Sequence, residues 1–361
     1  MQEKIIVTGG SGYIGSHTVV ELAKSGYDII CLDNMERADR EIWNRVQEIV
    51  GREIPLEEVD LRDWESTRQA IEKHSDAIGV VHFAAYKYVS ESVRKPMDYF
   101  YNNVIGLLNL LKAIEKTSIR YFLFSSSCSV YGNAKSLPVT EEMPFEEAES
   151  PYARTKQIAE HILKDLAVYE GKLKVVSLRY FNPVGAHPTY KIGEALVGEP
   201  ENLFPRINLA VAGRLPQITI FGNDYPTRDG TPIRDYIHIM DLAEAHVLAM
   251  KWLIENEPVY EVFNLGTGDG LTVLEIIKAF EEYNGIAVPY SFGPRRKGDV
   301  AAVYASGEKA ERVLGWKPKR KVKEMVVDAW RWHLVMEQTP YFRKRLDEKF
   351  PREYSATASI V

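Results

Sequence analysis

The chain has 361 residues, 45% of them hydrophobic, which is enough to bury the core of one large or two modest domains. Its net charge is −6 at pH 7 and its basic residues are scattered, so a nucleic-acid surface is disfavoured. Cys31 and Cys128 form neither a disulfide framework nor a zinc-type spacing, and no other metal site is expected. Neither a signal-like first segment nor an apolar run of the ~18–20 residues that span a membrane is present. The sequence therefore predicts a cytoplasmic protein without a membrane partner.

Short apolar runs alternate with longer amphipathic stretches in the first half of the chain. Strands are predicted at Lys4–Val7, Asp28–Leu32, Leu56–Val59, Val80–Phe83, Tyr121–Phe124 and Lys174–Leu178. The clearest helices are Gly15–Ser25, Trp64–His74, Met97–Lys116 and Pro151–Tyr169. Strands rich in Val, Ile, Leu and Phe that alternate with helices indicate a parallel sheet covered on both faces. Because parallel neighbours need right-handed crossovers, the predicted fold is α/β with a doubly wound, mostly parallel sheet.

A smaller, mixed C-terminal lobe is predicted where the composition changes. The segment Asn182–Asp235 is rich in proline and glycine, which is typical of loops with short elements. A strand at Glu261–Leu265 and a helix at Val273–Tyr283 follow. The expected division is residues 1–181 plus about 236–266 for the first domain, about 182–235 plus 267–344 for the lobe, and 345–361 for a tail without periodicity.

The first strand runs into the glycine-rich segment Thr8-Gly-Gly-Ser-Gly-Tyr-Ile-Gly15, and a helix follows at once. Gly9 would permit a tight turn, Gly12 the approach of a pyrophosphate, and Gly15 close packing of helix on strand. The helix N-terminus would present free N–H groups and a positive dipole end to the phosphates. In this strand–loop–helix context the motif predicts a Rossmann dinucleotide-binding domain rather than a flexible loop.

Acidic residues after the next two strands fit the adenosine half of such a cofactor. Asp33 lies 18 residues beyond Gly15, close to where a carboxylate accepts hydrogen bonds from the ribose. Its charge would repel a 2′-phosphate, so NAD is favoured over NADP. Taken alone, Asp33 is also compatible with a solvated strand end. Asp60, after the third strand, is a second candidate for the adenine edge.

A serine strand end and a tyrosine–lysine pair are the catalytic candidates. Ser125–Ser127 ends the fifth strand, at the carboxyl edge where ligands bind in such sheets. Tyr152 follows Ser127 by 25 residues and opens the next predicted helix, so Tyr152 and Lys156 stand at i and i+4 on one helix face. A chance pair is possible in a chain with 20 tyrosines, but this position favours catalysis.

The chemistry explains why these residue types belong together. A free phenol has a pKa of ~10, and lowering it to ~7 requires about 4 kcal/mol of preferential stabilisation of the phenolate. The Lys156 ammonium and the positive nicotinamide ring can supply that in a site with little water. Lys156 would also hold the nicotinamide ribose, and Ser127 would hydrogen-bond the reacting oxygen of the substrate.

Taken together, the glycine loop, the Ser–Tyr–Lys set and Arg179-Tyr-Phe-Asn-Pro-Val-Gly185 resemble the extended short-chain dehydrogenase/reductase family. Further motifs are similar to the UDP-hexose 4-epimerases of that family: His82-Phe-Ala-Ala-Tyr-Lys87, Glu91-Ser-Val-Arg-Lys-Pro96, Phe221-Gly-Asn-Asp-Tyr-Pro226 and Arg234-Asp-Tyr-Ile-His238. The likeness runs from about residue 4 to about residue 335. It implies reversible, NAD-dependent inversion of carbon 4 of UDP-glucose and UDP-galactose through a 4-keto intermediate.

The resemblance also implies the residues of the site, with Ser127, Tyr152 and Lys156 as the catalytic group. The implied NAD site comprises Gly9, Gly12, Tyr13, Ile14, Gly15, Asp33, Asn34, Asp60, Leu61, Phe83, Ala84, Lys87, Asn102 and Tyr180. The implied UDP-sugar site comprises Ser127, Tyr152, Phe181, Asn182, Asn202, Leu203, Arg234, Arg296, Asp299 and Val303. Of these, Arg234 and Arg296 would grip the pyrophosphate, as bidentate arginines do, and Asp299 would hold the uridine ribose.

Two further expectations come from the family. Val303 occupies a position beside the carbon 2 substituent of the sugar, where a tyrosine accompanies plain hexoses. The smaller valine predicts that UDP-N-acetylglucosamine and UDP-N-acetylgalactosamine are also accepted. The helices near Tyr99–Lys116 and Pro151–Tyr169 form a dimer bundle in the family, so a homodimer is expected.

The sequence offers two alternative functions, and each makes a prediction about particular residues. A nucleotide-sugar 4,6-dehydratase needs an acid pair just after the active-site hydroxyl, where this chain has Cys128 and Ser129. Neither side chain can do that work, so a dehydratase is disfavoured. A non-catalytic NAD-sensing module predicts loss of the active-site tyrosine or lysine, and both are present.

Overall fold

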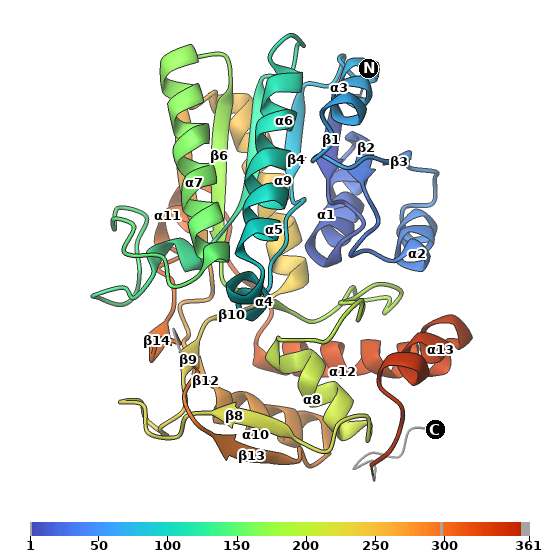
Figure 1. Cartoon of the computed structure of the whole chain (residues 1–361), viewed down its shortest axis with the longest axis vertical. Coiled ribbons are helices and arrows are strands. Elements are labelled where there is room, and N and C mark those ends of the chain that lie inside the picture. The colour runs from blue at the N-terminus through green and yellow to red at the C-terminus, as the bar shows by residue number, and fades with distance from the viewer. Residues whose placement is uncertain (1, 297–298, 355–361) are drawn as a thin grey trace.

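The computed structural model describes residues 2–296 and 299–354, and its centre is one seven-stranded sheet (Figure 1). The strands follow the order β11-β6-β5-β4-β1-β2-β3, and every neighbouring pair is parallel. Their bounds are β1 Lys4–Thr8, β2 Asp28–Asp33, β3 Leu56–Glu58, β4 Gly79–His82, β5 Tyr121–Ser127, β6 Lys174–Tyr180 and β11 Tyr260–Leu265. The predicted doubly wound α/β fold is thereby confirmed.

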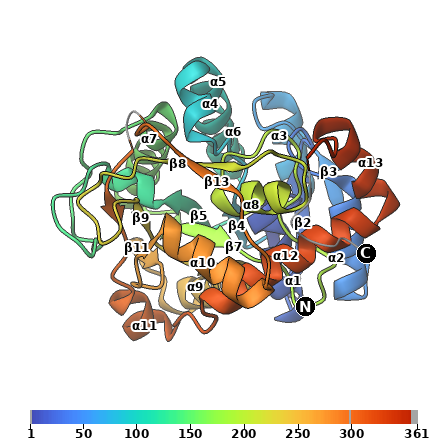
Figure 2. The ribbon, with the colours of Figure 1, turned by 90° about the horizontal axis from the view of Figure 1, so that it is seen from below.

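Helices cover both faces of the sheet (Figures 1 and 2). One layer holds α1 (Tyr13–Lys24), α2 (Arg40–Val50) and α9 (Ile239–Asn256). The other holds α3 (Trp64–Lys73), the continuous helix α5–η1–α6 (Pro96–Phe100, Tyr101–Ile105, Gly106–Ile114) and α7–η3 (Pro151–Asp165, Leu166–Glu170). Separate clusters of buried apolar residues fill the two interfaces. The sheet is therefore apolar on both faces, as its Val- and Ile-rich strands predict.

The second lobe lies beyond the carboxyl ends of the strands, below the sheet in Figure 1. Its elements are α8 (Leu203–Val211), β8 (Ile218–Phe221), β9 (Ile233–Arg234), β12 (Leu271–Thr272), α10 (Val273–Asn284), β13 (Tyr290–Gly293), β14 (Ala302–Val303) and α12 (Val322–Gln338). Short connecting elements are α4 (Val89–Arg94), η2 (Cys128–Tyr131), β7 (Asn182–Val184), β10 (Tyr236–His238) and α11 (Glu308–Leu314). The lobe has an apolar core of its own, which includes Ile207, Phe280 and Trp330.

The end of the described chain is more ordered than the sequence suggests. Helix α13 (Pro340–Lys349) crosses residue 345, where the tail is expected to begin, because Phe342 and Leu346 are buried in the main core. Residues 355–361 of the expected tail lie outside the described residues. Among the described residues, none of the helices combines the length and the apolar character needed to cross a membrane.

A buried ion pair attaches α12 and α13 to the rest of the lobe. The Arg214 guanidinium donates to both carboxylate oxygens of Glu337 at 2.5 and 2.8 Å, and to the Asp347 carboxylate at 2.8 Å. The side chains of Arg214 and Glu337 are essentially inaccessible to solvent. The arginine holds the pKa of Glu337 well below its usual range, against the effect of burial. Removing either partner would leave a charge buried without its full set of partners.

We predict that Arg214→Met lowers the free energy of unfolding by about 3 kcal/mol, because the buried Glu337 carboxylate loses two charged hydrogen bonds and keeps the one from Arg352 at 2.8 Å. Urea unfolding followed by circular dichroism measures this. Lys251→Met is the matched control, since its partner Glu255 lies 3.8 Å away on the surface. That change should cost less than about 0.5 kcal/mol. Equal unfolding midpoints for the two variants would contradict the prediction.

Candidate active site

The glycine-rich segment between β1 and α1 has no room for a side chain at Gly9 or Gly15. Gly9 has a φ of +69°, and a Cβ atom there would lie 2.6 Å from the Ala84 backbone nitrogen. A Cβ atom on Gly15 would lie 2.3 Å from the Gly9 carbonyl oxygen. The loop backbone is thus packed against the residues after β4, and the N-terminus of α1, with Tyr13 and Ile14, faces the sheet edge. This cradle fits the pyrophosphate of a dinucleotide.

The residues expected to hold the adenosine half lie beside this loop. Asp33, at the end of β2, accepts hydrogen bonds from the backbone N–H groups of Ser11 and Met35, each at 3.0 Å. Burial raises its pKa, and these hydrogen bonds oppose that effect. Asp60 forms a chelated pair with Arg62, which holds the pKa of Asp60 below its usual range.

The residues expected around the nicotinamide end come from β4, β6 and the helix η1. The rings of Phe83 and Tyr180 both pack against His246 of α9, with centroid distances of 4.9 and 5.7 Å. Asn102 donates to the side chain of Asn103 at 3.0 Å. Asn103 in turn bonds both backbone groups of Tyr86. Sequence reasoning missed Asn103, which fixes the strand-to-helix loop.

The catalytic candidates meet at the carboxyl edge of β5. Ser127 is the last residue of β5, and its hydroxyl accepts a hydrogen bond from Ser129 N–H at 3.2 Å. Helix α7 begins at Pro151, with Ser150 as its N-cap, so Tyr152 and Lys156 occupy its first two turns. The Lys156 ammonium donates to the Ser125 carbonyl at 2.6 Å and lies 6.0 Å from the centre of the Tyr152 ring.

Burial shifts the pKa values of the pair in opposite directions. It raises the pKa of Tyr152 to about 12, although a hydrogen bond with Ser127 and the charge of Lys87 act in the other direction. It lowers the pKa of Lys156 to about 7, against the opposing charge of Glu160. Both effects favour the neutral forms, because a buried site solvates charge poorly. Lys87 is the cation that acts on Tyr152 here, a contribution that sequence reasoning did not assign.

A second buried charge pair supports helix α7. Glu160 lies one turn beyond Lys156 and accepts from the Arg179 guanidinium at 2.7 and 2.9 Å. It also accepts from Ser126 at 2.5 Å and from Tyr260 at 3.1 Å. Sequence reasoning missed Glu160, and its spacing of four residues from Lys156 is the signal that could have found it.

A cleft between the sheet edge and the lobe gathers most of the predicted UDP-sugar residues. It contains about 1000 Å³ of unfilled space, part of it open to solvent, and its walls include Asn182, Asn202, Leu203, Arg234, Arg296 and Asp299. Arg234 is ion-paired with Asp299. The Arg296 guanidinium lies 3.9 Å above the Phe221 ring, and burial lowers the pKa of Arg296. Arginines and an exposed helix N-terminus at Leu203 suit a diphosphate.

Phe181 and Val303 do not line this cleft. Both belong to a small apolar cluster with Val130, Tyr131 and Val139, where Val303 is 9% exposed. In the strand pair β9–β14, Val303 stands opposite Arg234. Val303 is thus paired with one residue of the cleft wall, Arg234, and Phe181 directly precedes another, Asn182.

Comparisons with known proteins agree with this geometry. The family described as "NAD dependent epimerase/dehydratase family" matches residues 5–266. The UDP-glucose 4-epimerase of Bacillus subtilis is 48% identical, and the match covers 91% of this chain and 96% of that protein. The UDP-glucose 4-epimerase of Stenotrophomonas maltophila, solved with bound NAD and formylated UDP-arabinopyranose, is 42% identical with a TM-score of 0.90, over 93% of this chain and 99% of that one.

The name of a third relative includes an N-acetylated substrate as well as UDP-glucose. The UDP-Glc/GlcNAc 4-epimerase of Campylobacter jejuni is 33% identical with a TM-score of 0.79, over 92% of this chain and 99% of that one. The extent of this similarity and the glycine loop that fits a dinucleotide both identify the same family. The chain belongs to the NAD-dependent epimerase/dehydratase family, in its UDP-glucose 4-epimerase branch.

Proposed function

We propose that this chain interconverts UDP-glucose and UDP-galactose by inverting carbon 4, with NAD as a resident cofactor. The observation that carries the proposal is the position of Tyr152 and Lys156. They stand at i and i+4 on α7 beside the carboxyl end of β5, the same sheet edge at which β1 runs into the glycine loop. Bound NAD would accept a hydride from carbon 4 and return it to the other face of the resulting ketone.

The protein's own groups have separate tasks in this scheme. Tyr152, as phenolate, takes the proton from the 4′-hydroxyl and later returns it. Ser127 holds the same oxygen, and its hydrogen bond with Tyr152 favours the phenolate. Lys156, fixed by the Ser125 carbonyl, holds the nicotinamide ribose. Arg234 and Arg296 hold the diphosphate while the sugar turns over between the two hydride transfers.

The division of the chain follows from this scheme. Residues 1–181 with about 236–266 would bind NAD, and about 182–235 with 267–344 would bind the nucleotide sugar. The cleft supports this assignment, since its walls come from α8, β8, β9 and the loop before β14.

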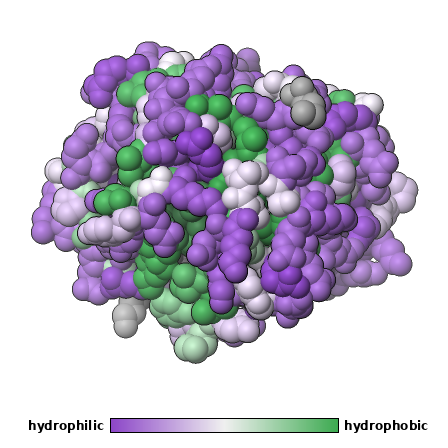
Figure 3. Space-filling model, turned by 90° about the horizontal axis from the view of Figure 1, so that it is seen from above, coloured by the Kyte–Doolittle hydropathy of each residue, from purple (hydrophilic) through white to green (hydrophobic). Residues whose placement is uncertain are grey.

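The protein would act as a homodimer. Large apolar side chains are exposed on α4, α5, η1, α6 and η3: Val89, Val93, Met97, Tyr101, Ile105, Leu108, Val168 and Tyr169. Apolar residues gather at the lower edge of the view in Figure 3, the side on which α6 and α7 lie. Contiguous exposed apolar surface of this kind suits a protein partner, and a second copy of the chain would cover it.

The proposed compartment is the cytoplasm. Cys31 and Cys128 are both free thiols, which suits reducing surroundings.

The assay that tests the function is conversion of UDP-glucose to UDP-galactose. Tyr152→Phe should reduce kcat by about 10²–10⁴-fold while NAD stays bound, because only the reacting hydroxyl is removed. Tyr283→Phe is the matched control, since Tyr283 is 40% exposed on α10, outside the cleft and the proposed dimer surface, and it should turn over normally. Inactivity of the unmodified protein would refute the function, and near-normal kcat for Tyr152→Phe would exclude Tyr152 as the base.

Replacing Lys156 with Met should move the acidic limb of the kcat–pH profile to higher pH. In its protonated form Lys156 would favour the phenolate, so without it the pKa of Tyr152 would rise and more alkaline conditions would be needed to form the base. Steady-state kinetics between pH 6 and about 10 would measure the shift. An unchanged limb would mean that Lys87, which also acts on Tyr152, supplies the positive charge.

We also propose that the enzyme epimerises UDP-N-acetylglucosamine, as the name of the Campylobacter jejuni relative says of that protein. Valine at position 303 is smaller than a tyrosine and lies next to Phe181 in the apolar cluster, where a tyrosine ring would demand more volume. Val303→Tyr should abolish turnover of UDP-N-acetylglucosamine and spare that of UDP-glucose. Turnover of both substrates is measured side by side. If the unmodified protein fails to convert the N-acetylated substrate at saturation, the argument from residue 303 is wrong.

A further inference from the structure

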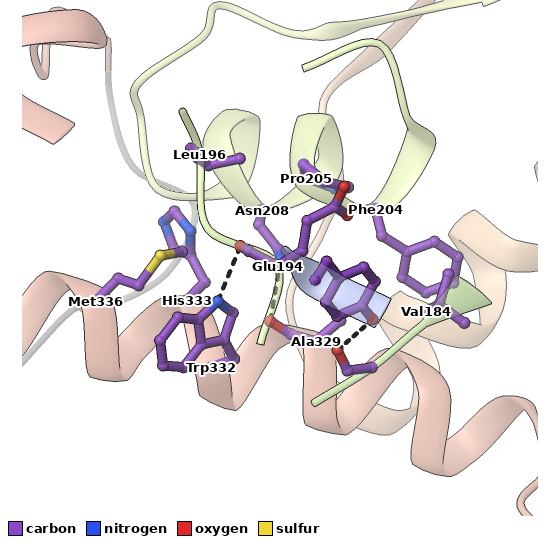
Figure 4. Close-up of a pocket in the computed structure, with 12 residues that line it drawn as sticks. Val184, Glu194, Leu196, Phe204, Pro205, Asn208, Ala329, Trp332, His333 and Met336 are labelled. Atoms are coloured by element: carbon purple, nitrogen blue, oxygen red, sulfur yellow. Dashed lines mark hydrogen bonds between the residues drawn. The ribbon is translucent and has the colours of Figure 1, made fainter. Parts of the chain in front are cut away.

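The segment before α8 carries Glu194, whose carboxylate lies between Lys87 and Asn202. The backbone of the segment is closed into a short hairpin by the bond from His187 N–H to the Ile192 carbonyl, at 3.1 Å. A Cβ atom on Gly193 would lie 2.5 Å from the Trp332 ring. The Trp332 indole N–H donates to the Glu194 carbonyl at 3.0 Å (Figure 4). The position of Glu194 is therefore fixed by α12.

The Glu194 side chain contacts both binding sites at once. Its Oε1 atom accepts from the Lys87 ammonium at 2.8 Å and from the Asn202 side-chain amide at 3.2 Å. Lys87 comes from the loop after β4, on the cofactor side. Asn202 is the N-cap residue of α8, in the wall of the nucleotide cleft. The Glu194 side chain is 16% exposed, whereas the side chain of its partner Lys87 is 43% exposed.

A carboxylate is unexpected at this place. Glu194 lines the same cleft as Arg206, Arg234 and Arg296, where a diphosphate is expected, and its charge would repel that ligand. Its pairing with Lys87 offsets the repulsion and holds the ammonium in a fixed direction. Lys87 acts electrostatically on Tyr152 and lies 6.0 Å from the centre of the Tyr13 ring in the glycine loop.

We propose that Glu194 is a positioning residue that couples the two sites, holding Lys87 for the cofactor and Asn202 for the nucleotide sugar through one oxygen atom. This inference rests on the proposed function of the cleft and the cradle. A change at Glu194 would then alter binding on both sides of the domain boundary, although Glu194 itself touches neither reacting atom. Substrate binding and cofactor retention would be linked through this single side chain.

The test uses the NAD-loaded enzyme and compares Glu194→Ala, Glu194→Gln, Lys87→Met and the double variant Lys87→Met/Glu194→Ala. Glu194→Ala should raise KM for UDP-glucose about tenfold with kcat changed less than about threefold, and should speed NAD loss on dilution. Glu194→Gln keeps an acceptor oxygen and should recover part of both effects. In the Lys87→Met background the effect of Glu194→Ala on KM should shrink to about threefold or less.

Lys191→Met is the matched control, because Lys191 belongs to the same segment and pairs with Glu48 across the domain boundary at 2.8 Å, away from the site. It should leave KM and NAD retention unchanged. The proposal is overturned if Glu194→Ala behaves like Lys191→Met, or if its effect and that of Lys87→Met are additive. The unmodified enzyme is assayed alongside. If it epimerises UDP-glucose, either of these outcomes overturns the role of Glu194 and leaves the proposed function intact.

Discussion

The geometry of the active site depends on one buried carboxylate, that of Glu160. It accepts hydrogen bonds from residues of three adjacent strands: Ser126 on β5, Arg179 on β6 and Tyr260 on β11. A buried charge is tolerated only where such partners surround it, so α7 can dock on the sheet in one register. Lys156 lies one turn earlier on the same helix, and its ammonium then reaches the Ser125 carbonyl. Tyr152 follows from the same register, one further turn toward the helix N-terminus.

The parallel sheet brings the remaining parts to the same place. Each strand ends on one edge, so the glycine loop after β1, the loop after β4 and the serines of β5 share that edge although they are far apart in sequence. The lobe adds the arginines from the other side. Short strand pairs make that connection, with β7 beside β10 and β9 between β12 and β14. The residues proposed to bind the cofactor, to act as the base and to bind the diphosphate therefore gather at the carboxyl side of the sheet.

Much of the NAD-binding half could be predicted because its signals are local. The glycine motif, the offset from Ser127 to Tyr152, and the alternation of apolar strands with helices are all visible within short windows. Helices α2 and α9 escaped prediction, although Asp39 caps the first and Gly51 ends it. In the lobe, the predicted helix at Val273–Tyr283 is confirmed as α10. The strands β9 and β14 could not be predicted, since they have two residues each and form only by pairing with distant segments.

Contacts between distant segments are the part that sequence reasoning could not supply. Nothing in the order of residues pairs Glu160 with Arg179, or Glu194 with Lys87, because charged residues at those positions are equally compatible with solvated surface. The same limit applies to α13, whose apolar residues Phe342 and Leu346 find partners only in the folded chain. Family resemblance suggests the ligand residues, whereas the residues that hold those side chains in position are seen only in the structure.

The opposite pKa shifts of Tyr152 and Lys156 have one cause and one consequence. Burial stabilises the neutral phenol and the neutral amine alike, so the protein alone does not hold a phenolate at neutral pH. Ser127 and Lys87 act in the other direction, but the pKa of Tyr152 stays at about 12. A further positive charge is needed next to the ring, and the oxidised nicotinamide would supply it. As the proposed base, Tyr152 would then be active only when the hydride acceptor is present in its oxidised form, which would restrict deprotonation of the sugar to complexes that can complete the reaction.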